Sequence, residues 1–200
     1  MTEALRIILP VYLLVFFLVA FVWRSYLVYK RTGVNPYVVG KGKGAIDFVE
    51  SLYRVPALLL LLTTLAFSFL PGVYQFATPI LWLESNVVQG VGLALMAIAL
   101  IWTATAQMQM GTSWRIGIDQ EQETDLVERG LFSISRNPIF LGMRTALIGV
   151  FLALPNAVTL MAVVLADVLI QIQVRLEEEF LTSMHGEKYT DFQKRVRRWI

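Results

Sequence analysis

Three short polar motifs in the last third of the chain contain the residues best suited to chemistry. They are Arg136-Asn137-Pro138, Glu177-Glu178-Glu179 and His185-Gly186-Glu187-Lys188-Tyr189. A carboxylate binds an ammonium or sulfonium group, and the free backbone N–H groups of a helix start hold a carboxylate or a ribose hydroxyl. Because apolar stretches lie next to these motifs, we expect them at a lipid–water boundary, where a polar cofactor meets a lipophilic substrate.

Each motif also has a simpler structural interpretation. Pro138 suits the first turn of a helix, because its missing N–H would be unpaired there, and Asn137 stands at the N-cap position. Three adjacent glutamates point in different directions around a helix, so at most two of them serve one site. Taken alone, the first motif predicts a capped membrane helix and the second a solvated helix face.

Long apolar blocks must position these motifs. Hydrophobic residues make up 56% of the 200 residues and charged residues 16%, against about 45–50% and about 25% in soluble domains. Five blocks without strand-like alternation cover residues 7–26, 55–70, 87–106, 138–154 and 157–172. Helices are the remaining way to satisfy their backbone in lipid.

The expected fold is therefore all-α and integral to a membrane, with about five transmembrane helices and C-terminal amphipathic cytoplasmic helices. We expect one membrane domain over residues 1–200. Residues 1–106 supply N-terminal transmembrane helices, and residues 107–200 supply a functional loop, a helical hairpin and the C-terminal helices. Gly186 is expected to separate two amphipathic helices, the second with Tyr189 and Phe192 on its apolar side.

Composition excludes several classes of function. The chain has no cysteine and one histidine, so we expect no disulfide, no thiolate nucleophile and no metal site. A net charge of +2 is too small to indicate a nucleic-acid partner. The sequence Gly40-Lys41-Gly42-Lys43-Gly44 lacks the spacing of a phosphate-binding loop and predicts a flexible basic linker.

Basic residues predict the orientation in the membrane. Lys and Arg are concentrated in residues 24–54, 107–137 and 175–198, whereas residues 71–86 and the Pro155-Asn156 turn have none. The positive-inside rule places the basic segments in the cytoplasm and the N-terminus outside. We expect an integral protein of a bacterial inner (plasma) membrane, with its active site on the cytoplasmic side.

Arg144 and Asp167 lie at similar depth in the hairpin, each about eleven residues from the Pro155-Asn156 turn at about 1.5 Å per residue. A lone charge is costly in a membrane. Two interpretations stay open. Arg144 forms a structural ion pair with Asp167, or it faces the active-site cavity and orients an anionic substrate group.

Together these motifs resemble the isoprenylcysteine carboxyl methyltransferase family and the related phospholipid methyltransferases. The resemblance covers about residues 111–200 and depends on the order of several short motifs. These are Leu126-Val127, Gly130, Phe132, Arg136-Asn137-Pro138-Ile139-Phe140-Leu141-Gly142, Glu177-Glu178, His185-Gly186-Glu187-Lys188-Tyr189 and Arg195-Val196-Arg197-Arg198.

The resemblance implies a cytoplasmic site for S-adenosylmethionine and methyl transfer to a lipophilic or membrane-embedded acceptor. That acceptor would be an isoprenylcysteine-like carboxylate, a lipid or a small lipophilic molecule. The cofactor would be lined by Thr124, Asp125, Leu126, Val127, Phe132, Asn137, Pro138, Ile139, Phe140 and Glu177, to which we add Arg136 and Tyr189. Glu177 and Arg144 are the catalytic candidates. Arg115 and Gln173 are expected on the substrate side, and Gln173 stands where the family often has arginine.

Methyl transfer needs alignment more than an enzyme nucleophile or a metal, and aromatic rings such as Phe132, Phe140 and Tyr189 stabilise a sulfonium. Two alternatives remain. One is an NADPH-dependent membrane reductase of the sterol-reductase type, which the acidic residues between 119 and 128 disfavour. The other is a non-catalytic membrane scaffold.

Overall fold

The computed structural model describes residues 1–39, 45–118 and 124–200, which are mainly helical. The first half comprises α1 (Thr2–Phe17), η1 (Leu18–Trp23), α2 (Arg24–Thr32), α3 (Ala45–Leu52), α4 (Arg54–Phe69), α5 (Pro71–Tyr74), η2 (Gln75–Ala77) and η3 (Leu81–Leu83). The second half comprises α6 (Asn86–Met110), η4 (Gly111–Ser113), η5 (Gly130–Ser133), α7 (Pro138–Ala153), α8 (Ala157–His185) and α9 (Glu187–Arg195). Within the described ranges, β pairing is limited to two isolated bridges. The predicted all-α fold is confirmed. The Gly40–Gly44 linker and residues 119–123 lie outside the described residues.

Four helical segments among the described residues are long and apolar enough to cross a membrane. They are Thr2–Thr32, Ile46–Phe69, Asn86–Ser113 and Ala157–His185. The remaining predicted block, residues 138–154, forms α7, an apolar helix of 16 residues. At 1.5 Å per residue, α7 is about 24 Å long. The protein is therefore an integral membrane protein. The spans are longer than predicted: the first covers Thr2–Thr32 rather than 7–26, and the second begins at Ile46 rather than 55 because it includes α3 as well as α4.

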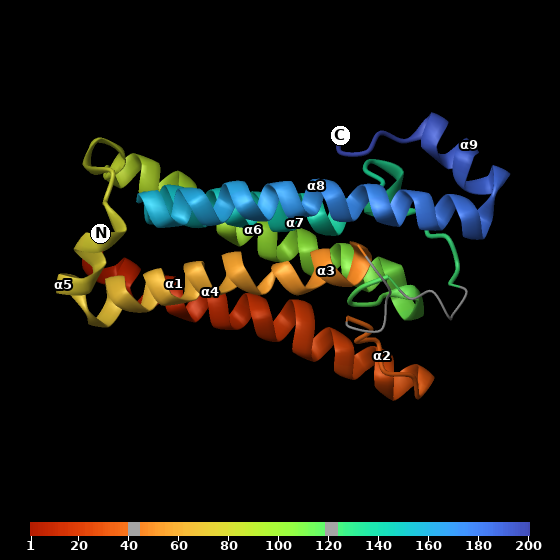
Figure 1. The fold of residues 1–200 in the computed structure, drawn as a ribbon, viewed down its shortest axis with the longest axis horizontal. Coiled ribbons are helices and arrows are strands. Elements are labelled where there is room, and N and C mark those ends of the chain that lie inside the picture. Colours follow the sequence, from red (N-terminus) through yellow and green to blue (C-terminus); the bar gives the residue numbers. More distant parts are fainter. Residues whose placement is uncertain (40–44, 119–123) are drawn as a thin grey trace.

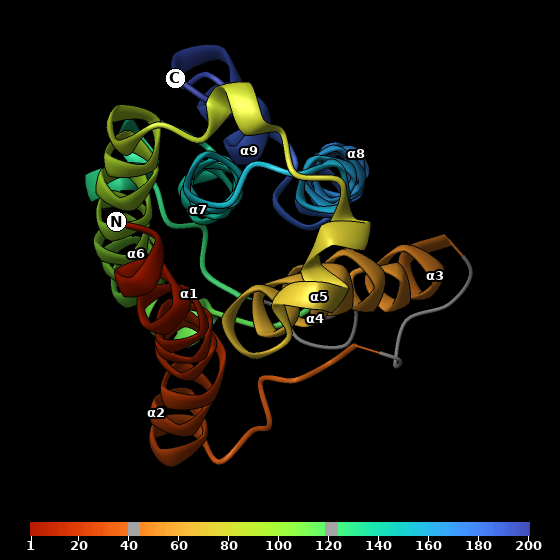
Figure 2. The same ribbon diagram turned by 90° about the vertical axis from the view of Figure 1, so that its left-hand side faces the viewer.

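The bundle has two unlike ends (Figure 1). The N-terminal end holds the start of α1, the segment from α5 to the start of α6, and the α7–α8 turn. The C-terminal end holds α2, the start of α7, the end of α8, α9 and the chain terminus. Viewed along its axis, α7 lies between α6 and α8, and α4 lies near α8 (Figure 2).

Glycines allow α6 and α7 to pack closely. A Cβ added at Gly92 would lie 2.6 Å from the Ala153 backbone nitrogen, and one at Gly149 would lie 2.8 Å from the Gly92 carbonyl oxygen. Small residues let membrane helices approach in this way. The Trp102 indole of α6 donates a hydrogen bond of 2.8 Å to the Pro138 carbonyl, which fixes the start of α7.

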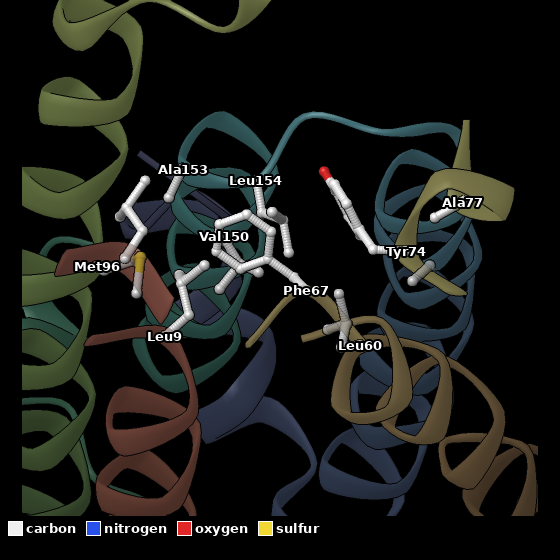
Figure 3. Packing of buried hydrophobic residues seen from close by; sticks show 11 residues of the cluster. Leu9, Leu60, Phe67, Tyr74, Ala77, Met96, Val150, Ala153 and Leu154 are labelled. Atoms are coloured by element: carbon white, nitrogen blue, oxygen red, sulfur yellow. The ribbon is translucent and has the colours of Figure 1, made fainter. Parts of the chain in front are cut away.

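The main apolar core lies nearer the N-terminal end, between α1, α4, α6 and α7, and includes Leu9, Phe67, Met96 and Val150 (Figure 3).

The C-terminal tail forms two helices that are separated at Gly186, as predicted. Helix α8 begins with a capping box between Asn156 and Thr159 and ends at Gly186, whose φ of 56° is left-handed. Helix α9 follows Gly186 and packs against α8.

Candidate functional site

Glu178 is the centre of an ion-pair cluster at the C-terminal end, which we call the arginine clamp (Arg136, Glu178 and Arg198). Its Oε1 accepts hydrogen bonds from Arg136 Nη2 at 2.9 Å and Arg198 Nε at 3.0 Å, and its Oε2 accepts one from Arg198 Nη2 at 2.6 Å. The Glu178 and Arg136 side chains are only 8% and 11% exposed. Hydrogen bonding to Glu178 raises the pKa of the Arg198 guanidinium. The arginine clamp thus joins the start of α7, α8 and the tail.

Backbone groups of the tail also bind the predicted Arg-Asn-Pro corner. The Arg136 N–H donates to the Arg197 carbonyl at 3.0 Å, and Asn137 Nδ2 donates to the Arg198 carbonyl at 3.3 Å. Asn137 and Pro138 occupy the predicted N-cap and first-turn positions, but no side chain caps α7. The Asn137 side chain is instead used to hold the tail, so the backbone N–H groups of the first turn receive no side-chain acceptor.

A second polar cluster lies on the other side of α8 and contains Glu50, Tyr53, Gln173 and Glu177; we call it the acidic cluster. Gln173 Nε2 lies 3.4 Å from Glu177 Oε1 and 3.5 Å from Glu50 Oε1. The Ile118 N–H donates to Glu50 Oε1 at 2.9 Å. Glu50 and Gln173 are buried. Two carboxylates therefore share one amide donor, and within the described residues neither accepts a hydrogen bond from an arginine or lysine.

Several polar atoms of this cluster have no protein partner among the described residues. The buried Gln173 Oε1 and Tyr53 hydroxyl make no hydrogen bond, and Tyr53 lies within electrostatic reach of both carboxylates. Buried polar groups are normally satisfied, so these two unpaired atoms beside two carboxylates are candidates for contact with a ligand. Gln173 Oε1 is an acceptor and the Tyr53 hydroxyl both donates and accepts; together with the two carboxylates they suit a donor-bearing or positively charged group.

Sequence reasoning missed Glu50 and Tyr53. Both lie in residues 24–54, which were interpreted as a cytoplasmic loop because of their basic residues. A signal was present: Ala45-Ile46-Asp47-Phe48-Val49 precedes Glu50 with helical spacing of apolar residues, which is typical of an amphipathic helix. Gln173, predicted on the substrate side, lies beside Glu177 and Glu50, and Glu50 comes from the other half of the chain; its substrate contact stays a prediction.

The predicted cofactor segment 124–132 packs beside α9. Half-buried Leu126 and Leu181 contact a cluster of Tyr189, Phe192 and Val196. Gln109 Oε1 accepts the Leu131 N–H at 2.7 Å and so fixes η5 and the buried Phe132. Thr124, Asp125 and Val127 are exposed or half-buried, as are Ile139 and Phe140 at the start of α7. The structure thus brings the segment from Thr124 to Phe132 and the tail to the same end as the start of α7.

Tyr189 is enclosed rather than open. Its side chain is 2% exposed, and its ring centroid lies 6.0 Å from that of Phe192. Burial, and secondly the Glu178 carboxylate, raises the pKa of the Tyr189 phenol, so the hydroxyl stays protonated. A direct cofactor contact for Tyr189 stays a prediction.

The predicted partners of the hairpin meet. Arg144 Nε lies 2.6 Å from Asp167 Oδ1, and the Arg144 guanidinium carbon lies 4.5 Å above the Trp199 ring. This is the ion pair of the structural interpretation, with a cation–π contact added by the tail. A substrate contact for Arg144 stays a prediction. Arg115 donates to the Thr112 and Trp114 carbonyls at 2.6 and 2.9 Å and precedes the residues that contact Glu50.

Two charged clusters thus lie at this end of the bundle: the arginine clamp with an excess of positive charge, and the acidic cluster with two carboxylates. A search of curated proteins finds no match to the sequence. A family model described as phospholipid methyltransferase matches residues 87–188, from the start of α6 into α9. The match begins earlier than the motifs alone indicated and ends before Tyr189. Since it spans just over half of the 200 residues, the chain belongs to the phospholipid methyltransferase family.

Proposed function

We propose that the protein transfers a methyl group from S-adenosylmethionine to the amino group of a lipophilic acceptor held in the membrane. Membership of a membrane methyltransferase family supports the reaction class. The acidic cluster supports the acceptor, and the shared Gln173 between Glu50 and Glu177 is the observation on which this choice depends. The family match also favours methyl transfer over the reductase and scaffold alternatives.

The cofactor side of the site is the start of α7 with the segment from Thr124 to Phe132. The residues there fit the cofactor, because the uncapped first turn of α7 offers N–H donors to a carboxylate or hydroxyl. The Ile139 and Phe140 N–H groups would hold these polar groups, Asn137 would offer its Oδ1 to a hydroxyl, and Phe132 and Leu126 would bound the site. When bound, S-adenosylmethionine supplies an electrophilic methyl group. The arginine clamp holds the α7 start in place through Arg136.

The acceptor side is the acidic cluster. An incoming carboxylate would be repelled by Glu50 and Glu177, whereas an amine donates to their oxygens and to Gln173 Oε1. An amine that gains a methyl group loses a proton, and Glu177 is the nearby group that accepts it. Gln173 and the Ile118 N–H hold Glu50, which keeps the second charge beside the amine. This assigns Glu177 the role of general base.

The membrane orientation follows from charge. The described parts of the basic segments, including α2 and α9, lie at the C-terminal end of the bundle (Figure 1). By the positive-inside rule this end faces the cytoplasm and the N-terminus lies outside. The cofactor would enter from water at this end, and the acceptor would enter from the bilayer, which for a bacterial protein is the inner membrane.

Cofactor binding is tested by calorimetric titration of the purified protein with S-adenosylhomocysteine. Wild-type protein is expected to bind, and Asn137→Ala and Glu177→Ala are expected to bind more weakly. Glu179→Ala is the matched control, because Glu179 is exposed, whereas Glu177 is half-buried and Glu178 is buried. Absence of binding by correctly folded wild-type protein would overturn the proposed cofactor.

The acceptor is tested by mass spectrometry of lipid mixtures incubated with protein and S-adenosylmethionine carrying a deuterated methyl group. Lipids with a primary amine and matched lipids with a carboxylate are supplied together. The label is expected on amine nitrogen, and the rate is expected to fall in Glu177→Gln. Label confined to carboxylates would exclude the acceptor proposed here while leaving methyl transfer itself intact.

A further inference from the structure

A cavity of about 470 Å³ opens at the N-terminal end of the bundle. It is bounded by the first turns of α1, by α5 and η3, by the start of α6 and by the α7–α8 turn. Along α8, the residues between this turn and Glu177 span about 30 Å at 1.5 Å per residue. The cavity is therefore separate from both clusters of the proposed methyltransferase site, and it lies toward the opposite membrane surface.

Two hydrogen-bond donors in the cavity lack adequate partners. The buried Arg6 Nε makes no hydrogen bond within the described chain. Arg6 Nη1 lies 3.5 Å from Glu3 Oε1, but the Glu3 side chain is 84% exposed, so this pair is weak. The guanidinium is therefore available to an anion from the cavity.

Tyr74 is the second donor. Its side chain is 9% exposed, and its hydroxyl has no hydrogen-bond partner in the described part of the chain. The nearby Asn156 side chain is already engaged with Leu154 and Thr159. The Tyr74 hydroxyl points toward the α7–α8 connection, beside Leu154 (Figure 3). Burial raises the pKa of Tyr74 to about 12, so the phenol keeps its proton and remains a donor.

The cavity also holds a group of opposite charge and an apolar wall. The Glu84 carboxylate lines it, as do Phe67 and Leu154. Beside it, Phe76 is 87% and Trp82 is 83% exposed. Exposed aromatic side chains at the end of a membrane bundle are typical of the headgroup level. One guanidinium, one phenol and one carboxylate beside an apolar wall complement an amphiphile that carries both a phosphate and an ammonium group.

We propose that this cavity binds the headgroup of a zwitterionic phospholipid from the leaflet opposite the methyltransferase site. Arg6 and Tyr74 donate to the phosphate oxygens, Glu84 accepts from the ammonium, and the acyl chains pass along Phe67 and Leu154. The bound lipid would join α1 to the α7–α8 turn. This site does not depend on the proposed methyl transfer, since it shares no residue with either cluster.

The test is thermal unfolding of the purified protein in dodecyl maltoside, followed by intrinsic tryptophan fluorescence without any methyl donor. Dihexanoyl phosphatidylethanolamine is expected to raise the unfolding temperature in a saturable way, because a ligand that binds the folded state stabilises it. Arg6→Gln and Tyr74→Phe are each expected to weaken the apparent affinity about tenfold, as for loss of a charge-assisted or buried hydrogen bond. Arg31→Gln is the control, since Arg31 is an exposed arginine at the other end.

Three further ligands identify the chemistry. Dihexanoyl phosphatidylglycerol has the phosphate without the ammonium and is expected to bind more weakly than the zwitterionic lipid in wild type, but equally in Glu84→Gln. Inorganic phosphate is expected to give a small shift, and a phosphate-free hexyl glycoside none. Equal shifts with phosphate alone would overturn the lipid assignment. An unchanged lipid affinity in both Arg6→Gln and Tyr74→Phe would overturn the site.

Discussion

The arginine clamp and the acidic cluster are built around adjacent residues, yet they are chemically opposite. Successive positions on a helix differ by about 100° in direction, so Glu178 faces the tail and Glu177 faces α3. Glu178 is bound by two arginines, whereas Glu177 shares the Gln173 amide with a second carboxylate. The first cluster pairs its single carboxylate with two guanidinium groups and keeps one excess positive charge. The second cluster has two carboxylates that share one amide donor. Its Gln173 Oε1 and Tyr53 hydroxyl make no hydrogen bond within the described chain.

This difference separates a structural role from a functional one. In the arginine clamp the buried Glu178 carboxylate has both arginines as partners, which favours one conformation, although Arg136 Nε makes no hydrogen bond among the described residues. A cluster of like charges with unpaired atoms costs stability and is retained where a ligand completes it. We therefore expect substitutions in the arginine clamp to affect mainly folding, and substitutions in the acidic cluster to affect mainly methyl transfer.

Glu177→Gln should give the largest effect. Removing a general base is expected to lower the rate of methyl transfer about 10³-fold, or about 4 kcal/mol in activation free energy. The unfolding temperature should change little, because Gln keeps the size of the side chain and no cation loses a partner. Labelled-methyl assays with parallel thermal unfolding measure both quantities. Glu179→Gln should change neither, and a Glu177→Gln enzyme of wild-type rate would contradict the role of the acidic cluster.

Glu178→Ala should give the largest loss of stability. It leaves Arg136 and Arg198 without their shared carboxylate in a mostly buried setting, which is expected to cost about 3 kcal/mol in the free energy of unfolding. Near-ultraviolet circular dichroism and tryptophan fluorescence on heating would report the loss. The tail should then become sensitive to proteases near Arg197. If Glu178→Ala were as stable as Glu179→Ala, the arginine clamp would not be the anchor inferred here.

Gly117→Ala should have a moderate effect on methyl transfer, because it would displace Glu50, the residue of the acidic cluster that lies beside Gly117. Gly117 has a φ of 93°, and an added Cβ would lie 3.0 Å from both Glu50 carboxylate oxygens. Backbone strain of this kind is expected to cost about 1–2 kcal/mol, and Glu50 should move away from Gln173. Methyl transfer should fall while Glu177 remains intact. Gly72→Ala is the control, because its Cβ would meet nothing within 4 Å; equal behaviour of the two variants would argue against a role for Glu50.

The sequence predicts the helical blocks well because each is a long apolar run, and depth along the hairpin correctly paired Arg144 with Asp167. It also predicts Asn137 and Pro138 at the start of α7, because capping chemistry is local. It does not predict that the Asn137 side chain binds the tail, or that Glu50 meets Gln173. Both contacts join residues far apart in the chain, and no local pattern specifies them. The different surroundings of Glu177 and Glu178 depend on these distant partners, so the motif alone leaves them equivalent.

Asp167→Asn should have the smallest effect, and it decides between the two interpretations of Arg144. Asn keeps an oxygen that accepts from Arg144 Nε, and the Trp199 ring still faces the guanidinium. Interhelical polar contacts in membranes are worth about 0.6 kcal/mol on average, so the unfolding temperature should fall slightly. If the pair is only structural, methyl transfer per folded molecule should stay at the wild-type level. A fall in activity without loss of stability would instead place Arg144 on the substrate side, because weakening its partner would then disturb an anionic group that it orients.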